Sequence, residues 1–331
     1  VILCLGAAAA WTVTGNYNLA ITRDRGKVLP SEFASEGVVL AVHPAYLMRN
    51  GGGLPFWKKD LRSAVELYQG SLVSLWKEPV WKVAQNRDDM QELVERYAKA
   101  EFIGADYETD GLNAIFNRVL MLGITLDGHN IDIIPEETYY ANLDLVKEIM
   151  EKKGPVWIWQ NGKFDIQWSW QDDIQARVDE DTMLASYALN ENQGFHDLDQ
   201  IAQSWIQAPA HKGVMDKYYK MAPHFSLRNA PVAELHQYAA YDIAKTFKMY
   251  FPLIKAVEAD ERTKRLYYKT LIRATPFFAR IERQGVLIDE EKVKENAARE
   301  DALIIEIEKR LQGYAKEYMR REINFGSYIQ V

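Results

Sequence analysis

The stretch FIGADYETDGL, residues 102–112, decides the fold, because it combines the pattern of a buried strand with a pair of acids. Apolar and polar residues alternate in it, which predicts a β-strand over 102–109 whose apolar side, including Tyr107, faces a core. Asp106 and Glu108 then project together from the opposite side, because side chains two residues apart share a strand face. Two like charges on a buried strand are costly unless a cation neutralises them, so the pair indicates a metal site or else a strand end in solvent.

The elements around this strand predict an α/β fold. Two apolar runs, 119–126 and 130–134, flank Asp127-Gly128, which is a strong hairpin signal, and a further strand is expected at 156–159. Helices are expected at 88–100, 142–153, 164–170, 182–189, 198–205 and 232–250. Three successive strands and then one more, wrapped by helices, imply a mixed sheet that is covered on both faces.

Two further segments carry acids in suggestive positions. In WIWQNGKFDIQW, a strand gives way to a helix at Asn161-Gly162, which puts Asp165 in the first turn of that helix. An acid there can simply favour the helix dipole. Tyr238 and Asp242 are four residues apart in the expected 232–250 helix and therefore share one of its faces, although such a pair alone is common on solvated helices.

The acids and the tyrosine make a sharper pattern together than they do separately. Metal-assisted hydrolysis of a phosphodiester uses two divalent ions about 3.5–4 Å apart, held by hard oxygen ligands. Four carboxylates, with a hydroxyl that positions the attacking water, are sufficient for such a site. The sequence therefore predicts a metal-dependent phosphodiesterase, provided that these acids converge in space.

The motifs DYETDGL, QNGKFD and YAAYD resemble, in order, the three motifs of the DEDD 3′–5′ exonucleases, in the subtype with a tyrosine in the third motif. The intervening DEDTMLASYALNEN and GFHDLDQIAQSWI are similar to the proofreading domain of family A DNA polymerases. The resemblance implies a ribonuclease H-like fold and a tyrosine, Tyr238, that orients the attacking water. It also implies two Mg²⁺ (or Mn²⁺) ions with four metal ligands: Asp106, Glu108, Asp165 and Asp242.

The same resemblance implies a substrate pocket. Thr109 and Leu112 stand where the family's residues touch the terminal nucleotide, and Asn161 and Phe164 match residues that line its pocket. Asp181 also matches the family, but we interpret it as the N-cap of the following helix. The implied substrates are single-stranded DNA 3′ ends and primer–template DNA, and the implied products are nucleoside monophosphates.

The flanking segments resemble other domains. LIRATPFFARIERQGVLIDEEKV and INFGSYIQV are similar to the beginning of the family A polymerase domain, and LGAAAAWTVTG and VVLAVHPAYLMR are similar to part of the uracil-DNA glycosylase superfamily. By that second resemblance, His43 would approach the uracil carbonyl, although a structural histidine is the alternative. The domains expected are a truncated glycosylase-like domain at 1–70, a linker with a short strand at 71–86, the exonuclease at 87–257 and the truncated start of the polymerase at 258–331.

Both ends of the chain are expected to be cut inside a domain. The opening VILCLGAAAAW superficially resembles a signal peptide but is better interpreted as a buried strand followed by a helix start. The polymerase's catalytic motifs and the glycosylase's cluster cysteines are expected outside this chain. We therefore expect neither activity from it, and a polymerase domain in cis in the full-length protein.

Composition limits the remaining possibilities. Of the 331 residues, 48% are hydrophobic and 26% charged, which excludes a mainly disordered chain, and the net charge of −7 gives no overall attraction for nucleic acid. A single cysteine, Cys4, excludes an intrachain disulfide and fits a reducing compartment. No apolar run reaches the ~18–20 residues of a membrane span, so we expect no membrane partner and a cytoplasmic location, in the host if the protein is phage-encoded.

Three alternatives to a proofreading exonuclease stay open. A catalytically silent DNA-positioning module would be expected to have lost at least one acid. A ribonuclease D-type RNA exonuclease shares the three motifs but carries other helical domains. A free-standing glycosylase is the weakest, because half of its domain is missing.

Overall fold

The computed structural model describes residues 1–49, 54–71, 75–191, 196–211, 215, 218 and 226–325. The chain divides into two compact units, Val1–Arg283 and Gln284–Val331, which are described separately below. In the described residues, no helix combines the length and the apolar character that a membrane span requires.

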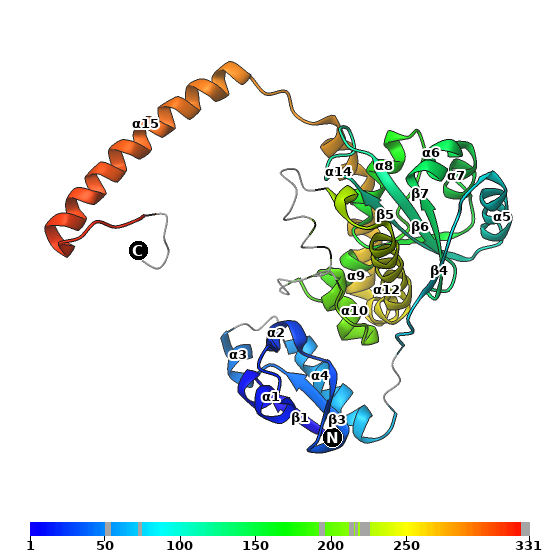
Figure 1. Ribbon diagram of the computed structural model, residues 1–331, viewed down its shortest axis with the longest axis horizontal. Coiled ribbons are helices and arrows are strands. Elements are labelled where there is room, and N and C mark those ends of the chain that lie inside the picture. Colours follow the sequence, from blue (N-terminus) through cyan, green and yellow to red (C-terminus); the bar gives the residue numbers. More distant parts are fainter. Residues whose placement is uncertain are drawn as a thin grey trace. The chain divides into compact units, whose positions relative to one another are not determined.

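A six-stranded mixed sheet forms the centre of the first unit, with the strand order β4-β7-β6-β5-β8-β9 (Figure 1). Its strands are β4 (Val80–Val83), β5 (Phe102–Thr109), β6 (Val119–Thr125), β7 (Asn130–Pro135), β8 (Val156–Trp159) and β9 (Glu180–Asp181). Strand β5 runs antiparallel to β6 and parallel to β8, and β6 and β7 form the predicted hairpin. The expected mixed α/β sheet is therefore confirmed, with β5 at its centre.

Helices cover both faces of this sheet. The helices of the exonuclease-like region are α5 (Arg87–Tyr97), α6 (Glu136–Ala141), α7 (Leu143–Met150), α8 (Gly162–Gln171), α9 (Thr182–Leu189), α10 (Leu198–Ile206) and α12 (Val232–Glu258), and a 3₁₀ turn, η3, spans Leu227–Asn229. Helices α5, α6, α7 and α8 share one hydrophobic core with the side of β5 that carries Tyr107. Trp157 and Trp159 are fully buried in that core and are not base-stacking platforms.

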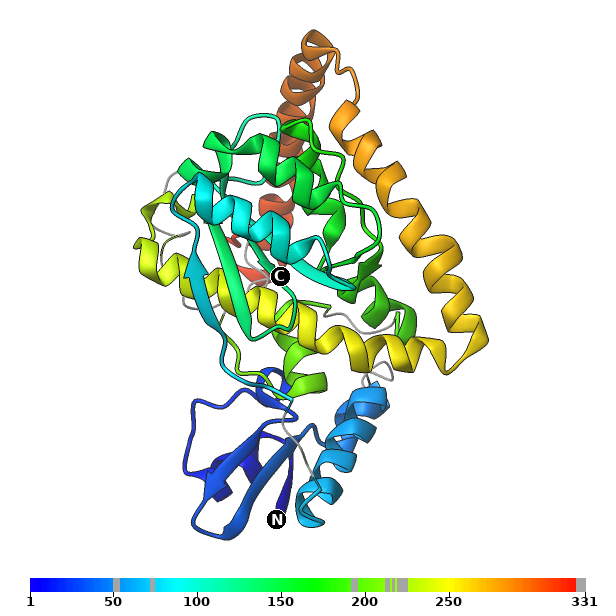
Figure 2. The ribbon, with the colours of Figure 1, turned by 90° about the vertical axis from the view of Figure 1, so that its right-hand side faces the viewer.

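Helix α12 lies on the opposite face and contacts five strands, from β4 to β8 (Figure 2). Two glycines on the sheet permit this close approach. A Cβ at Gly123 of β6 would lie 1.9 Å from Ile243 Cδ1, and a Cβ at Gly104 of β5 would lie 3.0 Å from the Phe247 ring. Because both positions lack a side chain, the helix rests directly on β5 and β6, and its residues reach the acids of β5.

The N-terminal lobe of the first unit is a smaller α/β layer. Its elements are β1 (Ile2–Leu5), α1 (Ala7–Thr14), α2 (Ile21–Asp24), β2 (Val28–Ser31), β3 (Ala34–Ala41), α3 (Pro44–Arg49) and α4 (Leu54–Tyr68). The strand order is β1-β3-β2, with β1 parallel to β3. Cys4 is buried in the core of the lobe, as expected for a packed thiol. His43 is exposed just after β3, and its Nδ1 accepts a hydrogen bond from the Ala45 N–H at 3.1 Å.

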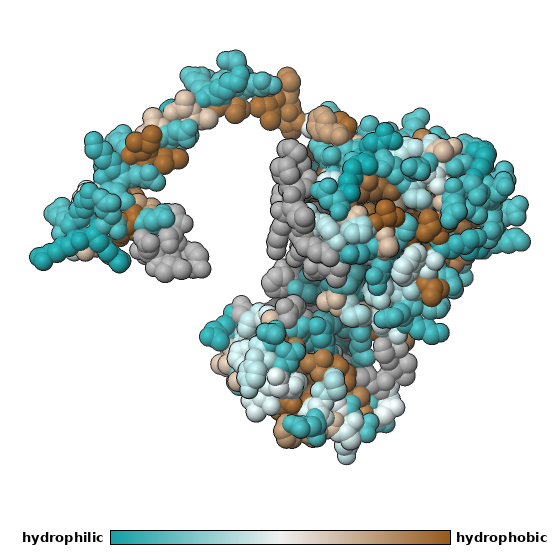
Figure 3. Space-filling view, viewed as in Figure 1, coloured by the Kyte–Doolittle hydropathy of each residue, from teal (hydrophilic) through white to brown (hydrophobic). Residues whose placement is uncertain are grey.

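The last part of the chain is helical. It comprises α13 (Glu261–Leu266), a π-helical turn, η4 (Tyr267–Leu271), α14 (Ile272–Gln284), α15 (Glu290–Tyr314) and a second π-helical turn, η5 (Ala315–Met319). Helix α15 buries none of its residues within the described chain. Figure 3 shows apolar side chains exposed among charged ones along α15. The last six residues of the INFGSYIQV segment lie outside the described residues.

Candidate active site

Three of the four predicted acids converge on one side of β5. Asp106, Glu108 and Asp242 each offer a carboxylate oxygen, and these oxygens lie within 4.8 Å of one another. Asp106 is half-buried, whereas Glu108 and Asp242 are buried. The pair on β5 therefore shares the face opposite Tyr107, as the alternation predicted, and α12 brings the third acid onto that face.

The fourth acid, Asp165, lies beside the same strand. It is buried in the first turn of α8, and its Oδ1 accepts a hydrogen bond from the backbone N–H of Tyr107 at 3.1 Å. Tyr107 is the residue between Asp106 and Glu108, so Asp165 is fixed to the middle of the pair. Burial raises the pKa of Asp165 to about 8, although the Tyr107 N–H opposes that rise. Such a group carries its charge at neutral pH only where a nearby cation compensates for the lost solvent.

The turn that delivers Asp165 is tightly held. Asn161 adopts a left-handed backbone (φ 63°), which redirects the chain from β8 into α8. A Cβ at Gly162 would lie 2.7 Å from Trp159 Cβ, so only glycine fits there. Asp181 accepts from the N–H groups of Asn161 and Gly162 at 3.2 and 2.8 Å. It also caps α9 through two further N–H groups, which confirms the predicted N-cap.

Tyr238 lies one turn before Asp242 on α12 and is half-buried, on the predicted shared face. The predicted nucleotide contacts differ in their exposure. Leu112 is 77% exposed, and it lines a cavity of about 220 Å³ together with Phe164. Thr109 is buried and donates to the Gly111 carbonyl at 2.7 Å. Thr109 and Asn161 are not among the residues that line this cavity.

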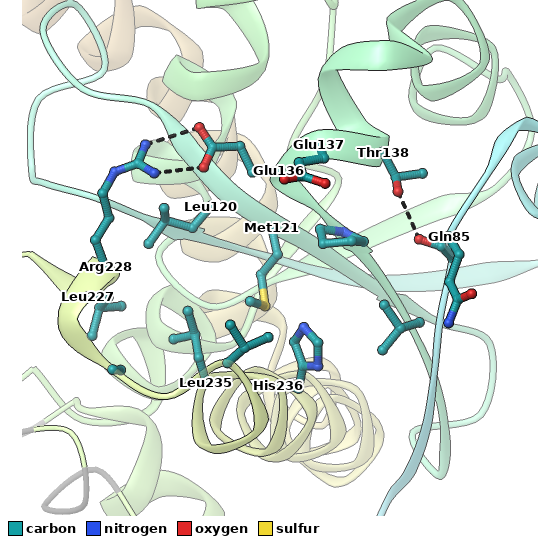
Figure 4. A pocket seen from close by; sticks show the side chains of 15 residues that line it. Gln85, Leu120, Met121, Glu136, Glu137, Thr138, Leu227, Arg228, Leu235 and His236 are labelled. Atoms are coloured by element: carbon teal, nitrogen blue, oxygen red, sulfur yellow. Dashed lines mark hydrogen bonds and ion pairs between the residues drawn. The ribbon is translucent and has the colours of Figure 1, made fainter.

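The loop between β5 and β6, which carries Leu112, is anchored at its base. Asp110 accepts from the Arg118 N–H at 2.6 Å, which closes the loop, and from Arg228 Nε at 2.8 Å. Arg228 also makes a bidentate pair with Glu136, at 2.7 and 3.0 Å, on the wall of a separate cavity of about 600 Å³ (Figure 4). The hydrogen bonds from Arg228 lower the pKa of Glu136. The loop is therefore held by a network of charged groups, while its apolar tip stays exposed.

Sequence reasoning missed one residue at this site. His211 follows α10, and its Nε2 lies 3.0 Å from Asp242 Oδ1. Burial alone lowers the pKa of His211, but hydrogen bonds to Asp199 and Asp242 outweigh that effect and raise it to about 9. Because His211 is in a loop and belongs to no periodic pattern, nothing in the sequence signalled its position.

The fold and the acid cluster together define an α/β nuclease. Residues 82–258, more than half of the chain, match the 3′–5′ exonuclease family of the kind found in family A DNA polymerases. The chain belongs to this family. It therefore contains a 3′–5′ exonuclease domain, as predicted.

Two curated relatives of the chain are DNA polymerases. The DNA polymerase of Escherichia phage T5 is 25% identical over 165 residues, which are 45% of this chain and 19% of that protein. DNA polymerase I of Pseudomonas aeruginosa is 26% identical over 211 residues, 59% of this chain and 23% of that protein. The chain thus spans about a fifth of the length of these relatives.

Solved structures show the same fold. The POL domain of Pol1 from M. smegmatis, in complex with a DNA primer-template and dNTP, aligns with a TM-score of 0.55 and 14% identity, over 75% of this chain and 39% of that chain. A nuclease in its apo form aligns with a TM-score of 0.51 and 17% identity, over 63% of this chain and 95% of that chain. At these identities, the likeness concerns the fold alone.

Proposed function

We propose that this chain hydrolyses DNA 3′ ends to nucleoside monophosphates, as a proofreading exonuclease that depends on two divalent cations. The observation that carries the proposal is the convergence of Asp106, Glu108 and Asp242 within 4.8 Å. These acids come from a central strand and from a helix more than a hundred residues later. A solvated acidic surface would not require the glycines that let α12 lie so close to the sheet.

The donor set fits Mg²⁺ or Mn²⁺. All the donors are hard carboxylate oxygens, which such cations prefer. The raised pKa of the buried Asp165 indicates a site that needs positive charge in order to be ionised. The four acids Asp106, Glu108, Asp165 and Asp242 would hold the ions. When bound, the ions supply Lewis-acid stabilisation of the attacking and leaving oxygens.

The remaining side chains handle the substrate. Tyr238, on the same helical face as Asp242, orients the attacking water. Leu112 and Phe164 line one cavity and hold the terminal nucleobase by apolar contact. Thr109, at the end of β5, and Asn161, at the left-handed turn before α8, also contact the nucleotide. The contacts of Asp110 with Arg118 and Arg228 hold the β5–β6 loop, and with it Leu112, in place without the substrate.

Asp106→Ala tests the proposal directly. Loss of a metal ligand removes several kcal/mol of transition-state stabilisation, so we expect trimming of a 5′-labelled single-stranded DNA to slow at least about a thousandfold. Tyr238→Phe should be milder, because it misplaces water and keeps every ligand. EDTA should stop trimming by the parent chain. A matched control is Asp144→Ala, whose acid forms an exposed ion pair with Arg87.

The outcomes separate the alternatives. Equal rates for Asp106→Ala and the parent would contradict the proposed site. No trimming by the parent in Mg²⁺ or Mn²⁺ would instead support a silent DNA-positioning module. Faster trimming of an RNA of the same sequence would favour the ribonuclease D-type alternative.

We further propose that the exonuclease acts on primer–template DNA in the cytoplasm, next to a polymerase domain in cis. The support is that the two curated relatives named above are DNA polymerases and that residues 271–293 resemble the opening of that domain. The glycosylase-like interpretation of residues 1–70 stays a prediction. In its favour is the small α/β lobe, with His43 exposed at the end of β3.

A further inference from the structure

Asp242 does not stand alone on α12, because His211 contacts it from a neighbouring loop. His211 Nε2 lies 3.0 Å from Asp242 Oδ1 and 3.3 Å from the backbone carbonyl of Tyr238. The hydrogen bond of Nε2 goes to the Tyr238 carbonyl. The contact with Asp242 is an ion pair, because Asp242 Oδ1 is buried and has no hydrogen-bond partner among the described residues.

Asp199 of α10 holds the far side of His211. The backbone N–H of His211 donates to Asp199 Oδ2 at 3.0 Å, and His211 Nδ1 lies 3.2 Å from Asp199 Oδ1. The backbone N–H contact fixes the position of His211, and its ring nitrogen Nδ1 lies next to the carboxylate. The side chain of His211 is 11% exposed, so solvent offers it little alternative bonding.

Lys245 contacts both Asp199 and His211. Its side chain is fully buried, and its Nζ lies 2.5 Å from Asp199 Oδ1 and 2.5 Å from His211 Nδ1. A buried ammonium is costly unless it is paired, so Lys245 needs Asp199 close by. Lys245 is on α12, three residues after Asp242. The group thus begins and ends on the same helix and ties α10 and the His211 loop to it.

Two aromatic rings restrict the imidazole further. The ring centroid of His211 lies 5.1 Å from that of Tyr238 and 5.3 Å from that of Tyr241. The two rings are inclined to the imidazole by 39° and 40°, respectively. The ring therefore has little room to turn away from Asp242.

We propose that His211, fixed by Asp199 and Lys245, is a positioning residue that sets the orientation of the Asp242 carboxylate. The inference rests on the proposed function, in which Asp242 is a metal ligand. Hydrogen-bond partners behind a ligand fix its rotamer, and their loss commonly weakens metal affinity or activity about 10–100-fold. His211 has no place in the three sequence motifs, so this role is specific to the contacts seen in the structure.

The test measures binding of Mn²⁺ alone to the full chain by calorimetry, without nucleic acid. We expect His211→Ala to weaken Mn²⁺ binding about 10–100-fold and to slow DNA trimming in parallel, with partial recovery at high Mn²⁺. His211→Gln keeps an N–H donor that can reach Asp242 and should restore most of the affinity. His129→Ala, at the tip of the β6–β7 hairpin, is the matched histidine control and should change neither quantity.

Each other outcome overturns the inference. Unchanged Mn²⁺ binding in His211→Ala would show that Asp242 needs no support, and tighter binding would make His211 a competitor of the metal. Equal losses in the Ala and Gln variants would assign the effect to ring packing. If His211→Ala fails to fold, Asp199→Asn and His211→Gln provide the same comparison. Failure of the proposed function is distinguishable, because it would be seen as normal trimming by Asp106→Ala.

Discussion

Two helices of similar length, α12 and α15, show how differently one kind of element can be used. Helix α12 buries residues along most of its length, from Leu235 to Val257, and carries two of the proposed site residues. Helix α15 buries none and exposes apolar residues such as Ile305. Both are long α-helices, of 27 and 25 residues. Contacts with the sheet give the polar side chains of α12 defined positions. A helix can therefore contribute to an active site only where it is packed against the rest of the fold.

The largest expected contrast compares one leucine on each helix. Leu253 of α12 is fully buried, whereas Leu303 of α15 is 46% exposed. Leu253→Ala should lower the free energy of unfolding by about 2–5 kcal/mol, because it leaves a cavity. Leu303→Ala should change that quantity by less than about 0.5 kcal/mol. Urea unfolding followed by tryptophan fluorescence measures the free energy of unfolding of the first unit in both variants, since all nine tryptophans precede residue 284.

A similar loss in both variants would mean that α15 also packs against the first unit. A loss in neither would show that the core around the second half of α12 tolerates a cavity. Either result would remove the contrast between the helices.

The fold was largely predictable from local patterns. The strand over 102–109 and the strand over 156–159 have the expected bounds, and the hairpin at Asp127-Gly128 is present. Helix α12 extends to Glu258, beyond the expected end at 250. It continues through Pro252 because Leu253 and Val257, after the proline, are fully buried, and local propensity does not report that burial.

The residues of the site that lie in sequence motifs were predictable. A residue that reaches the site only through tertiary packing was not. The acids on β5, α8 and α12 stand in three motifs whose order indicated one site. His211 is held by Asp199 and Lys245, on two separate helices. A contact that depends on the relative placement of three elements leaves no periodic trace in the sequence. The two-residue strand β9 was missed because it is too short for an alternating pattern.

An intermediate effect concerns Glu180 of β9, close to the second half of α12. Its carboxylate accepts from Tyr267 at 2.8 Å and from Tyr268 at 3.2 Å. Burial raises the pKa of Glu180 to about 7, although the tyrosine hydroxyls oppose the rise. The folded state therefore holds a proton that the unfolded state releases above about pH 4.5. The contribution of Glu180 to the free energy of unfolding is therefore at its maximum below about pH 4.5 and is lost as the pH rises to about 7.

Urea unfolding at pH 5 and pH 8 measures this dependence. The free energy of unfolding should fall by up to about 3 kcal/mol over the range in the parent chain. The fall should be smaller in Glu180→Gln, which is neutral at both pH values. Glu300→Gln, the same substitution at an exposed position of α15, is the control. An identical pH dependence in Glu180→Gln and the parent would assign the effect to other groups.

The smallest expected effects compare two glycines. A Cβ at Gly123, which faces α12, would lie 1.9 Å from Ile243 Cδ1, whereas a Cβ at Gly313, within α15, would meet nothing within 4 Å. Gly123→Ala should destabilise the first unit by about 1–3 kcal/mol, because Ile243 is fully buried and has little room to move. Gly313→Ala should stabilise α15 by about 0.5–1 kcal/mol, as alanine does in an exposed helix.

Tryptophan-detected unfolding measures the first change, and helical circular dichroism measures the second. The decisive step adds Ile243→Val to Gly123→Ala, which removes the methyl group that the new Cβ would strike. The double variant should be more stable than the two single losses predict, with a coupling of about 0.5–3 kcal/mol. Additive losses would mean that the close approach of α12 to the sheet depends on something other than Gly123. In that case the position of Asp242 would have to be explained by the other glycine of the sheet that faces α12, Gly104, whose added Cβ would meet Phe247.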